Sequence, residues 1–230
     1  MMSAILDLFF PPRCPFCGKL LERSGGICAE CETALPLREA GRVLRTVGEN
    51  RYPCAVAMYY GGPAAQGIKA LKFGGKSWRA KPFARYIAQA AAEELSGQFD
   101  AVTYVPVSRR RNFRRGFDQA RLLAEETAKI WGARAEPTLR KIRHNRAQSS
   151  ISSPARRAEN VKGAYAVPRP DRVHGRRFLL IDDVCTTGST ISAAADALMA
   201  AGAACVVCAA LAGGRRSGEF LEESPDSGKI

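Results

Sequence analysis

Two adjacent carboxylates and a hydroxyl-rich loop lie within residues 178–190, which read FLLIDDVCTTGST. The apolar residues 178–181 predict a buried strand that ends in Asp182 and Asp183. A helix is predicted from Ser189 onward, so the loop lies between the carboxyl end of a strand and the start of a helix. Open α/β sheets bind their ligands at this position.

The residue types of this loop are suited to an anion. Gly188 allows the backbone to approach a ligand closely, and the first N–H groups of the helix can donate to it. The helix dipole favours a negative ligand by about 0.3–1 kcal/mol at an exposed site and up to about 2 kcal/mol at a partly buried one. Hydroxyl groups come from four further residues: Thr186, Thr187, Ser189 and Thr190.

The two aspartates are not expected to bind the phosphate directly, because like charges repel. Carboxylates can accept hydrogen bonds from sugar hydroxyls, or bind them through Mg²⁺, a hard cation that prefers oxygen ligands. The segment therefore predicts a site for a phosphorylated ribose, with phosphoribosyl pyrophosphate and Mg²⁺ as the expected occupants. The alternative is an ordinary helix N-cap behind a strand that merely ends in two acids.

The run IDDVCTTGST resembles the phosphoribosyl-pyrophosphate-binding motif of type I phosphoribosyltransferases. The resemblance implies a parallel sheet, a ligand cleft closed by a flexible loop, and Mg²⁺ bound with the pyrophosphate. It implies that Asp182 and Asp183 contact the ribose hydroxyls, while residues 186–190 surround the 5′-phosphate. Cys185 stands where that family usually has an apolar side chain, so we interpret it as small and apolar.

A second segment, residues 105–120, reads VPVSRRRNFRRGFDQA and contains five arginines. Guanidinium groups bind phosphate through two parallel hydrogen bonds, so this segment could hold a pyrophosphate or a nucleic-acid backbone. A solvated basic rim is the alternative. Asp118 is predicted to be the N-cap of the helix that follows. The candidate residues for the pyrophosphate are Lys72, Ser108, Arg109, Arg110 and Arg115.

This basic segment is similar to the VPxxxxRxxxRGFNQA region of the ComF competence-protein family, also called amidophosphoribosyltransferase-like. Residues 71–76 (LKFGGK) match the LKFxGK element of that family, and residues 138–161 resemble a further stretch of it. Asp118 stands where Asn is commoner. The resemblance runs from Cys14 to about Leu211, and it implies an N-terminal zinc finger and a part in the uptake of transforming DNA.

Four of the eight cysteines form two CxxC pairs: Cys14, Cys17, Cys28 and Cys31. Four thiolates make the closed tetrahedral shell of a structural zinc site. Such a site contributes about 10–16 kcal/mol of apparent binding free energy, so a short segment without a core can fold around it. Two disulfides are the disfavoured alternative. Cys205 and Cys208 lie three residues apart in an apolar run, which places them on opposite faces of a buried strand.

The chain has 35 Lys and Arg against 22 Asp and Glu, a net charge of +13. This excess attracts polyanions such as nucleic acid, anionic lipid or polyphosphate metabolites, although a solvated basic surface is also compatible with it. No apolar run approaches the roughly 18 residues of a membrane-spanning helix. The N-terminus lacks the basic region of a secretory signal, and the cysteine pattern favours a reducing compartment, so we expect a cytoplasmic protein.

Continuous apolar strands alternate with helices between residues 53 and 212. Strands are predicted at 55–60, 100–106, 177–181 and 203–211, and helices at 82–96, 118–131 and 189–201, with a helical turn at 64–72. This order predicts an α/β fold, a type I phosphoribosyltransferase-like parallel sheet flanked by helices with a small N-terminal zinc knuckle. The expected domains are a zinc-binding knuckle (1–35), a connector (36–52), the phosphoribosyltransferase-like domain (53–212) and a flexible tail (213–230).

Two functions are compatible with these features. The first is an enzyme or enzyme-like protein of the ComF family that binds phosphoribosyl pyrophosphate with Mg²⁺. If it transfers the phosphoribosyl group to an acceptor, catalysis is largely electrostatic. The second is a non-catalytic accessory protein that handles single-stranded DNA and uses the pocket as a ligand sensor. Single-stranded DNA and DNA-uptake proteins are the macromolecular partners considered.

Overall fold

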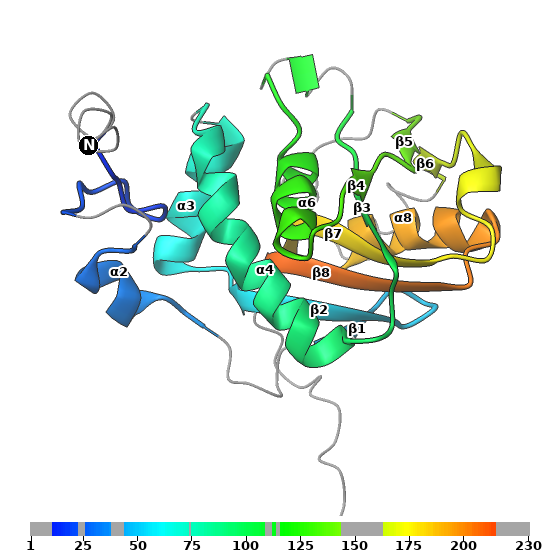
Figure 1. The fold of residues 1–230 in the computed structure, drawn as a ribbon, viewed down its shortest axis with the longest axis horizontal. Coiled ribbons are helices and arrows are strands. Elements are labelled where there is room, and N and C mark those ends of the chain that lie inside the picture. The colour runs from blue at the N-terminus through cyan, green and yellow to red at the C-terminus, as the bar shows by residue number, and fades with distance from the viewer. Residues whose placement is uncertain are drawn as a thin grey trace, which may run out of the picture.

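The computed structural model describes residues 11–22, 26–37, 44–73, 75–108, 112–113, 116–143 and 163–214. Its centre is a six-stranded sheet with the strand order β1-β2-β8-β7-β3-β4 (Figure 1). The strands are β1 (Leu44–Val47), β2 (Tyr52–Tyr59), β3 (Ala101–Tyr104), β4 (Ala135–Glu136), β7 (Arg177–Cys185) and β8 (Cys205–Gly213).

Five α-helices, two short 3-10 helices and a small second sheet surround the large one in the described residues. The helices are α2 (Ala29–Ala34), α3 (Gly62–Phe73), α4 (Ala80–Leu95), α6 (Gln119–Ile130), α8 (Ser189–Ala200), η1 (Ser77–Arg79) and η3 (Pro170–Arg172). The second sheet pairs β5 (Arg140–Lys141) with β6 (Tyr165–Ala166) in antiparallel orientation. Within the described part of the chain, none of the helices has the length and apolar character needed to cross a membrane.

In the described part of the six-stranded sheet, β2, β8, β7, β3 and β4 pair in parallel in this order, and β1 pairs antiparallel with β2. Strand β7 is central because β8 and β3 flank it. Its apolar residues 178–181 are fully buried, as expected for a parallel strand covered on both faces. The predicted α/β class with a parallel sheet between helices is therefore confirmed.

Two hydrophobic cores lie on the two faces of this sheet. Helices α4 and α6 cover one face, toward the viewer in Figure 1, and α8 covers the other. Alternation along β7 supplies both cores, since Leu179 faces the α4–α6 side and Leu180 faces the α8 side. Cys205 and Cys208 also lie on opposite sides, which confirms their placement on a buried strand.

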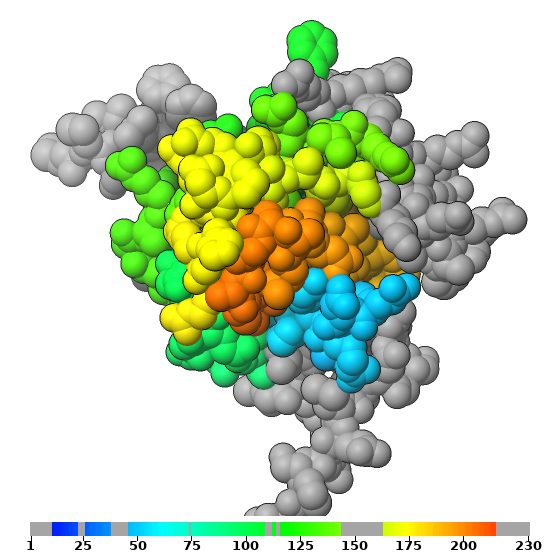
Figure 2. Space-filling view, turned by 90° about the vertical axis from the view of Figure 1, so that its right-hand side faces the viewer, coloured from blue at the N-terminus to red at the C-terminus, as the bar shows by residue number. Residues whose placement is uncertain are grey.

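The cysteine-rich segment packs at one end of the molecule, beside α3 (Figure 1). Phe16 is fully buried there, and its ring lies 5.1 Å from that of Phe83 and 5.9 Å from that of Tyr86, both on α4. The other end of the molecule is where β7 and β8 begin. Figure 2 shows that end, with the α8–β8 turn in orange beside the β1–β2 turn in cyan.

Several element bounds differ from the sequence-based expectation. Strand β7 continues through Cys185, so the two aspartates lie within the strand and the loop shrinks to residues 186–188. Helix α3 has 12 residues where a single turn was expected. Strand β1 lies inside the segment 36–52 that was expected to be a connector, because four residues of that segment pair with β2.

Candidate functional site

The acidic pair lies at the carboxyl end of β7. Asp183 is buried, whereas Asp182 is half-buried, and the backbone N–H of Asp183 donates to Oδ1 of Asp182 at 2.8 Å. Burial, and then the negative charge of Asp183, raises the pKa of Asp182 well above its ordinary value. Two carboxylates held this closely in a partly buried site need positive charge nearby.

Lys72 supplies that charge from the last turn of α3. Its Nζ lies 2.8 Å from Oδ1 of Asp183, and the two side chains are only 23% and 12% exposed. Burial alone would lower the pKa of Lys72, but the charge and hydrogen bond of Asp183, with a further contribution from Asp182, raise it above its ordinary value. The structure thus brings one candidate pyrophosphate residue directly against the candidate ribose site.

Gly188 shapes the loop between β7 and α8. Its φ of +78° lies in the left-handed region, and a Cβ at this position would be 2.6 Å from Cβ of Val47 on β1. Only glycine meets both demands without strain. The loop therefore depends on β1, a strand that is far from it in the sequence.

The hydroxyl groups of this loop are partly ordered by one another. Oγ1 of Thr187 lies 2.8 Å from Oγ of Ser189, and the N–H of Ser189 donates to the same Oγ1 at 3.4 Å. Thr186 is exposed, while Thr187, Ser189 and Thr190 are half-buried. A pocket is lined by these residues and their neighbours, from Val184 to Ile191.

The start of α8 lacks the usual side-chain cap. Gly188 occupies the N-cap position, where Ser, Thr, Asp or Asn would accept from the first helical N–H groups, and it has no side chain to do so. Within the described residues, only the N–H of Ser189 reaches a side chain, Oγ1 of Thr187 at 3.4 Å. The first N–H groups of a helix otherwise need an external acceptor. An anion is a suitable acceptor for the N–H groups of this first turn.

The base of the arginine-rich segment lies next to the acidic pair. Asp118 is the N-cap of α6, as predicted, because its Oδ1 accepts from the N–H of Arg121 at 3.2 Å. Its Oδ2 also accepts from the N–H of Val107 at 2.8 Å, which joins the two ends of the segment. Burial raises the pKa of Asp118, and the charge of Asp183 adds to this effect.

Ser108 is buried, and its Oγ has no hydrogen-bond partner among the described residues. The remaining candidates of this segment, Arg109, Arg110 and Arg115, lie outside the described residues. The structure therefore describes the two ends of the arginine-rich segment, and the roles of its arginines stay predictions.

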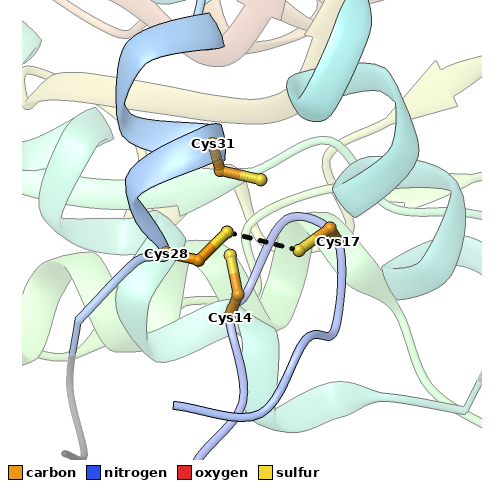
Figure 3. A group of neighbouring side chains, drawn as sticks. All are labelled: Cys14, Cys17, Cys28 and Cys31. Atoms are coloured by element: carbon orange, nitrogen blue, oxygen red, sulfur yellow. Dashed lines mark hydrogen bonds between the residues drawn. The ribbon is translucent and has the colours of Figure 1, made fainter. Parts of the chain in front are cut away.

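The four cysteines of the CxxC pairs form a compact cluster (Figure 3). Cys14 and Cys17 lie on one turn, while Cys28 and Cys31 lie at the start of α2, and the ligand atoms are all within 4.8 Å of one another. Sγ of Cys17 lies 3.6 Å from Sγ of Cys28, close to the roughly 3.8 Å expected around a tetrahedral zinc. None of these four cysteines is in a disulfide, so the cluster fits a structural zinc and not two disulfides.

Sequence reasoning missed Arg79, which lies on η1 between α3 and α4. Arg79 is 1% exposed, and its Nη1 donates to the carbonyl oxygens of Pro15 and Phe16 between the first two cysteines. A lone arginine in the run KSWRAK has no pattern that predicts burial, because charged residues are almost never fully buried without partners. Only the packing of the cysteine turn on α3 and α4 creates those partners.

Two family models match this chain. The double zinc ribbon domain matches residues 5–42, and the phosphoribosyl transferase domain matches residues 119–229. The sheet, the loop at the end of β7 and the cysteine cluster agree with both matches. The chain is thus a phosphoribosyltransferase-type α/β protein with an N-terminal zinc ribbon.

Individual relatives narrow this class to one family. The chain is 31% identical over 200 residues to the DNA utilization protein YhgH of Salmonella typhimurium, with 84% of this chain and 86% of the relative covered. It is 26% identical over 205 residues to competence protein F of Haemophilus influenzae, with 80% and 89% covered. The chain belongs to the ComF family, which confirms the resemblance seen in its motifs.

One solved structure with a similar fold is the glutamine phosphoribosylpyrophosphate amidotransferase of B. subtilis, complexed with ADP and GMP. The TM-score is 0.40 at 25% sequence identity. The similarity covers 63% of this chain and 27% of the amidotransferase chain, so this chain spans about a quarter of that structure.

Proposed function

We propose that this chain binds phosphoribosyl pyrophosphate together with Mg²⁺ at the carboxyl end of β7. The observation that carries the proposal is the ion pair between Lys72 and Asp183 beside the uncapped start of α8. A cation, two carboxylates and the N–H groups at the start of a helix within one site match a ligand that has both sugar hydroxyls and phosphates. The match to the phosphoribosyl transferase domain supports the same ligand class.

Each part of the ligand has a matching group in this proposal. Residues 186–190 donate to the 5′-phosphate through backbone N–H groups and hydroxyls. Asp182 and Asp183 accept from the ribose hydroxyls, and their oxygen atoms are the ligand type that Mg²⁺ prefers. Lys72 turns from Asp183 toward the pyrophosphate, which exchanges one charge partner for another.

Transfer of the phosphoribosyl group would follow from the same charges. The bond between C1 of the ribose and the pyrophosphate oxygen breaks, the pyrophosphate leaves with the electron pair, and the nucleophile of the acceptor bonds to C1. The carboxylates of Asp182 and Asp183 stabilise the positive charge that develops on the ribose, and Lys72 stabilises the leaving group. Bound Mg²⁺ supplies further positive charge for the pyrophosphate.

Isothermal titration of the zinc-loaded chain with phosphoribosyl pyrophosphate and Mg²⁺ tests this proposal. We expect measurable heat for the wild type and a loss of at least about tenfold in affinity for Asp182→Ala, since a hydrogen bond to a charged group contributes about 1.5–3 kcal/mol. Asp171→Ala is the matched control, because Asp171 is an exposed acid on η3. An absence of heat with folded wild-type protein would contradict the proposal.

A second candidate function is contact with single-stranded DNA. Two relatives of this chain are named for DNA utilization and competence, and the chain carries a net charge of +13. Around the end of α3, the large aromatic side chains of Phe73 and Trp78 are 67% and 43% exposed, with Lys76 between them in the sequence. Exposed aromatic rings among cations are the usual platform for stacking unpaired bases.

Fluorescence anisotropy with a labelled oligonucleotide over a range of salt concentrations tests this second function. We expect affinity to fall steeply with salt, and Trp78→Ala to weaken binding by roughly 5- to 100-fold, because stacking contributes about 1–3 kcal/mol per base. Trp131→Ala, an exposed aromatic at the end of α6, is the control. Binding that disappears in Asp182→Ala would instead assign the DNA effect to the ribose-phosphate site.

A further inference from the structure

Arg79 is a buried cation without an acidic partner in the described part of the chain. Its guanidinium donates to the carbonyl oxygens of Pro15 and Phe16, and its Nε is buried without a hydrogen-bond partner. No described carboxylate forms an ion pair with it. A buried charge of this kind is costly unless an opposite charge compensates it.

Arg79 lies against the turn that carries Cys14 and Cys17, because it donates to the carbonyl oxygens of the two residues between them. Four thiolates around one zinc ion carry a net negative charge, so the metal-loaded cluster supplies the compensation that the arginine lacks. The cluster in turn gains a fixed positive charge against the turn that holds its first two ligands. Nη2 of Arg79 also lies 3.3 Å from the place a Cβ on Gly18 would occupy, which puts it against the end of that turn.

We propose that Arg79 is the positioning residue of the zinc site, and that through it the zinc-loaded turn holds α3 and Lys72 in place. This goes beyond the proposed function, because it assigns a role to a residue outside the phosphoribosyl site and does not depend on which ligand binds there.

The contacts that connect the two sites follow α3. A Cβ on Gly67 of α3 would lie 3.1 Å from both the Cα of Phe16 and the carbonyl oxygen of Pro15, so the helix and the cysteine turn are in direct contact. Lys72 lies five residues farther along the same helix, with Asp183 at 2.8 Å. Arg79 follows on η1 and returns to the cysteine turn. The segment from Gly67 to Arg79 thus begins and ends on the zinc turn, with Lys72 between.

Competition for zinc with a chromophoric chelator tests the first part of the proposal on the full chain. We expect Arg79→Met to weaken zinc binding by about 10- to 100-fold, the effect typical of lost outer partners of a metal site. Lys19→Met is the matched control, because Lys19 is an exposed cation on the same turn that pairs with Glu30. We expect it to change zinc affinity less than about threefold. Equal effects of the two variants would overturn the proposal.

Arg79→Lys keeps the positive charge but loses the guanidinium group that donates to two carbonyl oxygens. Its zinc affinity should therefore lie between those of the wild type and Arg79→Met. If Arg79→Met does not fold, Arg79→Lys is the variant that tests the proposal. A wild-type zinc affinity in Arg79→Lys would show that the two hydrogen bonds to carbonyl oxygens do not contribute to zinc binding. The spectrum of the Co²⁺-substituted protein should keep its thiolate charge-transfer bands in both variants, because Arg79 is not itself a ligand.

Hydrogen exchange before and after zinc removal tests the second part. We expect amide exchange in α3 to rise at least about tenfold on removal, while exchange in α8, on the other face of the sheet, stays nearly unchanged. Unchanged exchange in α3 would overturn the coupling. Both measurements are made without phosphoribosyl pyrophosphate, so a failure of the proposed ligand would leave their outcome intact.

Discussion

Lys72 and Asp183 form the pair on which the candidate site depends, because both side chains are largely buried. Removing one partner of a buried pair leaves the other charge without compensation, and this usually costs more than the pair contributes. The pKa of Lys72 is raised, so its contribution to stability is fully present below the ordinary lysine pKa and is lost only as pH rises through the raised value. At neutral pH the ion pair is therefore intact.

Lys72→Met is expected to lower the free energy of unfolding by about 1–3 kcal/mol at neutral pH, since it leaves Asp183 buried and unpaired. Urea unfolding followed by circular dichroism measures the change. Lys69→Met is the control on the same helix, because Lys69 is exposed, and its effect should stay within about 0.5 kcal/mol. Similar losses in the two variants would show that the ion pair between Lys72 and Asp183 does not contribute to the free energy of unfolding.

Asp182→Asn should separate stability from ligand binding. A carboxyl group whose folded-state pKa is raised destabilises the fold as pH rises above its unfolded pKa of about 4, because ionisation is less favourable in the folded protein. The variant removes that effect, so its stability advantage over the wild type should grow with pH above about 4. Thermal unfolding at several pH values measures it, and a constant difference would contradict the assignment.

At the scale of elements, the loop between β7 and α8 packs against a strand that sequence reasoning did not predict. The β1–β2 hairpin packs along α8 as far as its second half, where Asp196 accepts hydrogen bonds from Asn50 and from the hydroxyl of Tyr52, both at 2.7 Å. Val47 lies against Gly188 at the start of the same helix. The hairpin therefore sets the position of the loop from outside the ligand site.

Gly188→Ala is expected to destabilise the protein by more than the roughly 1–2 kcal/mol of a left-handed φ, because its Cβ would also overlap Val47. Gly132→Ala is the matched control, since Gly132 has a φ of +67° and no atom within 4 Å of the Cβ position. Differential scanning calorimetry of both variants isolates the overlap. Equal losses would mean that the loop moves away from β1 at little cost.

At the scale of the whole molecule, the zinc ribbon and the sheet share one core. The core under α4 and α6 contains buried Cys14, Phe16 and Cys31 together with Phe83 and Ile87. A segment that packs into the core of its neighbour should unfold with it and not as a separate unit.

Zinc removal is thus expected to lower the melting temperature of the whole chain, because a metal that binds only the folded state stabilises that state by mass action. Calorimetry with and without chelator should show one transition in each case, shifted downward without zinc. In Cys14→Ser, which lacks one ligand, the chelator should have a smaller effect. A small separate transition that alone responds to chelator would show that the ribbon folds independently.

The sequence by itself determined the features that depend on local pattern. Spacing of four cysteines predicted the metal cluster, apolar runs predicted the parallel strands, and two aspartates before a Thr/Gly-rich turn predicted where a ligand would lie. These features are local because chelation, burial and helix starts each need only a few neighbouring residues. The family resemblance rested on the same local motifs.

The tertiary structure alone decided which distant residues complete these local features. Lys72 meets Asp183, Val47 requires the glycine at position 188, and Arg79 meets the turn between the first two cysteines. Each contact joins segments separated by more than 60 residues, so no periodicity or spacing encodes it. Such pairings arise only when the packing of helices on the sheet removes water and leaves each buried charge one available partner.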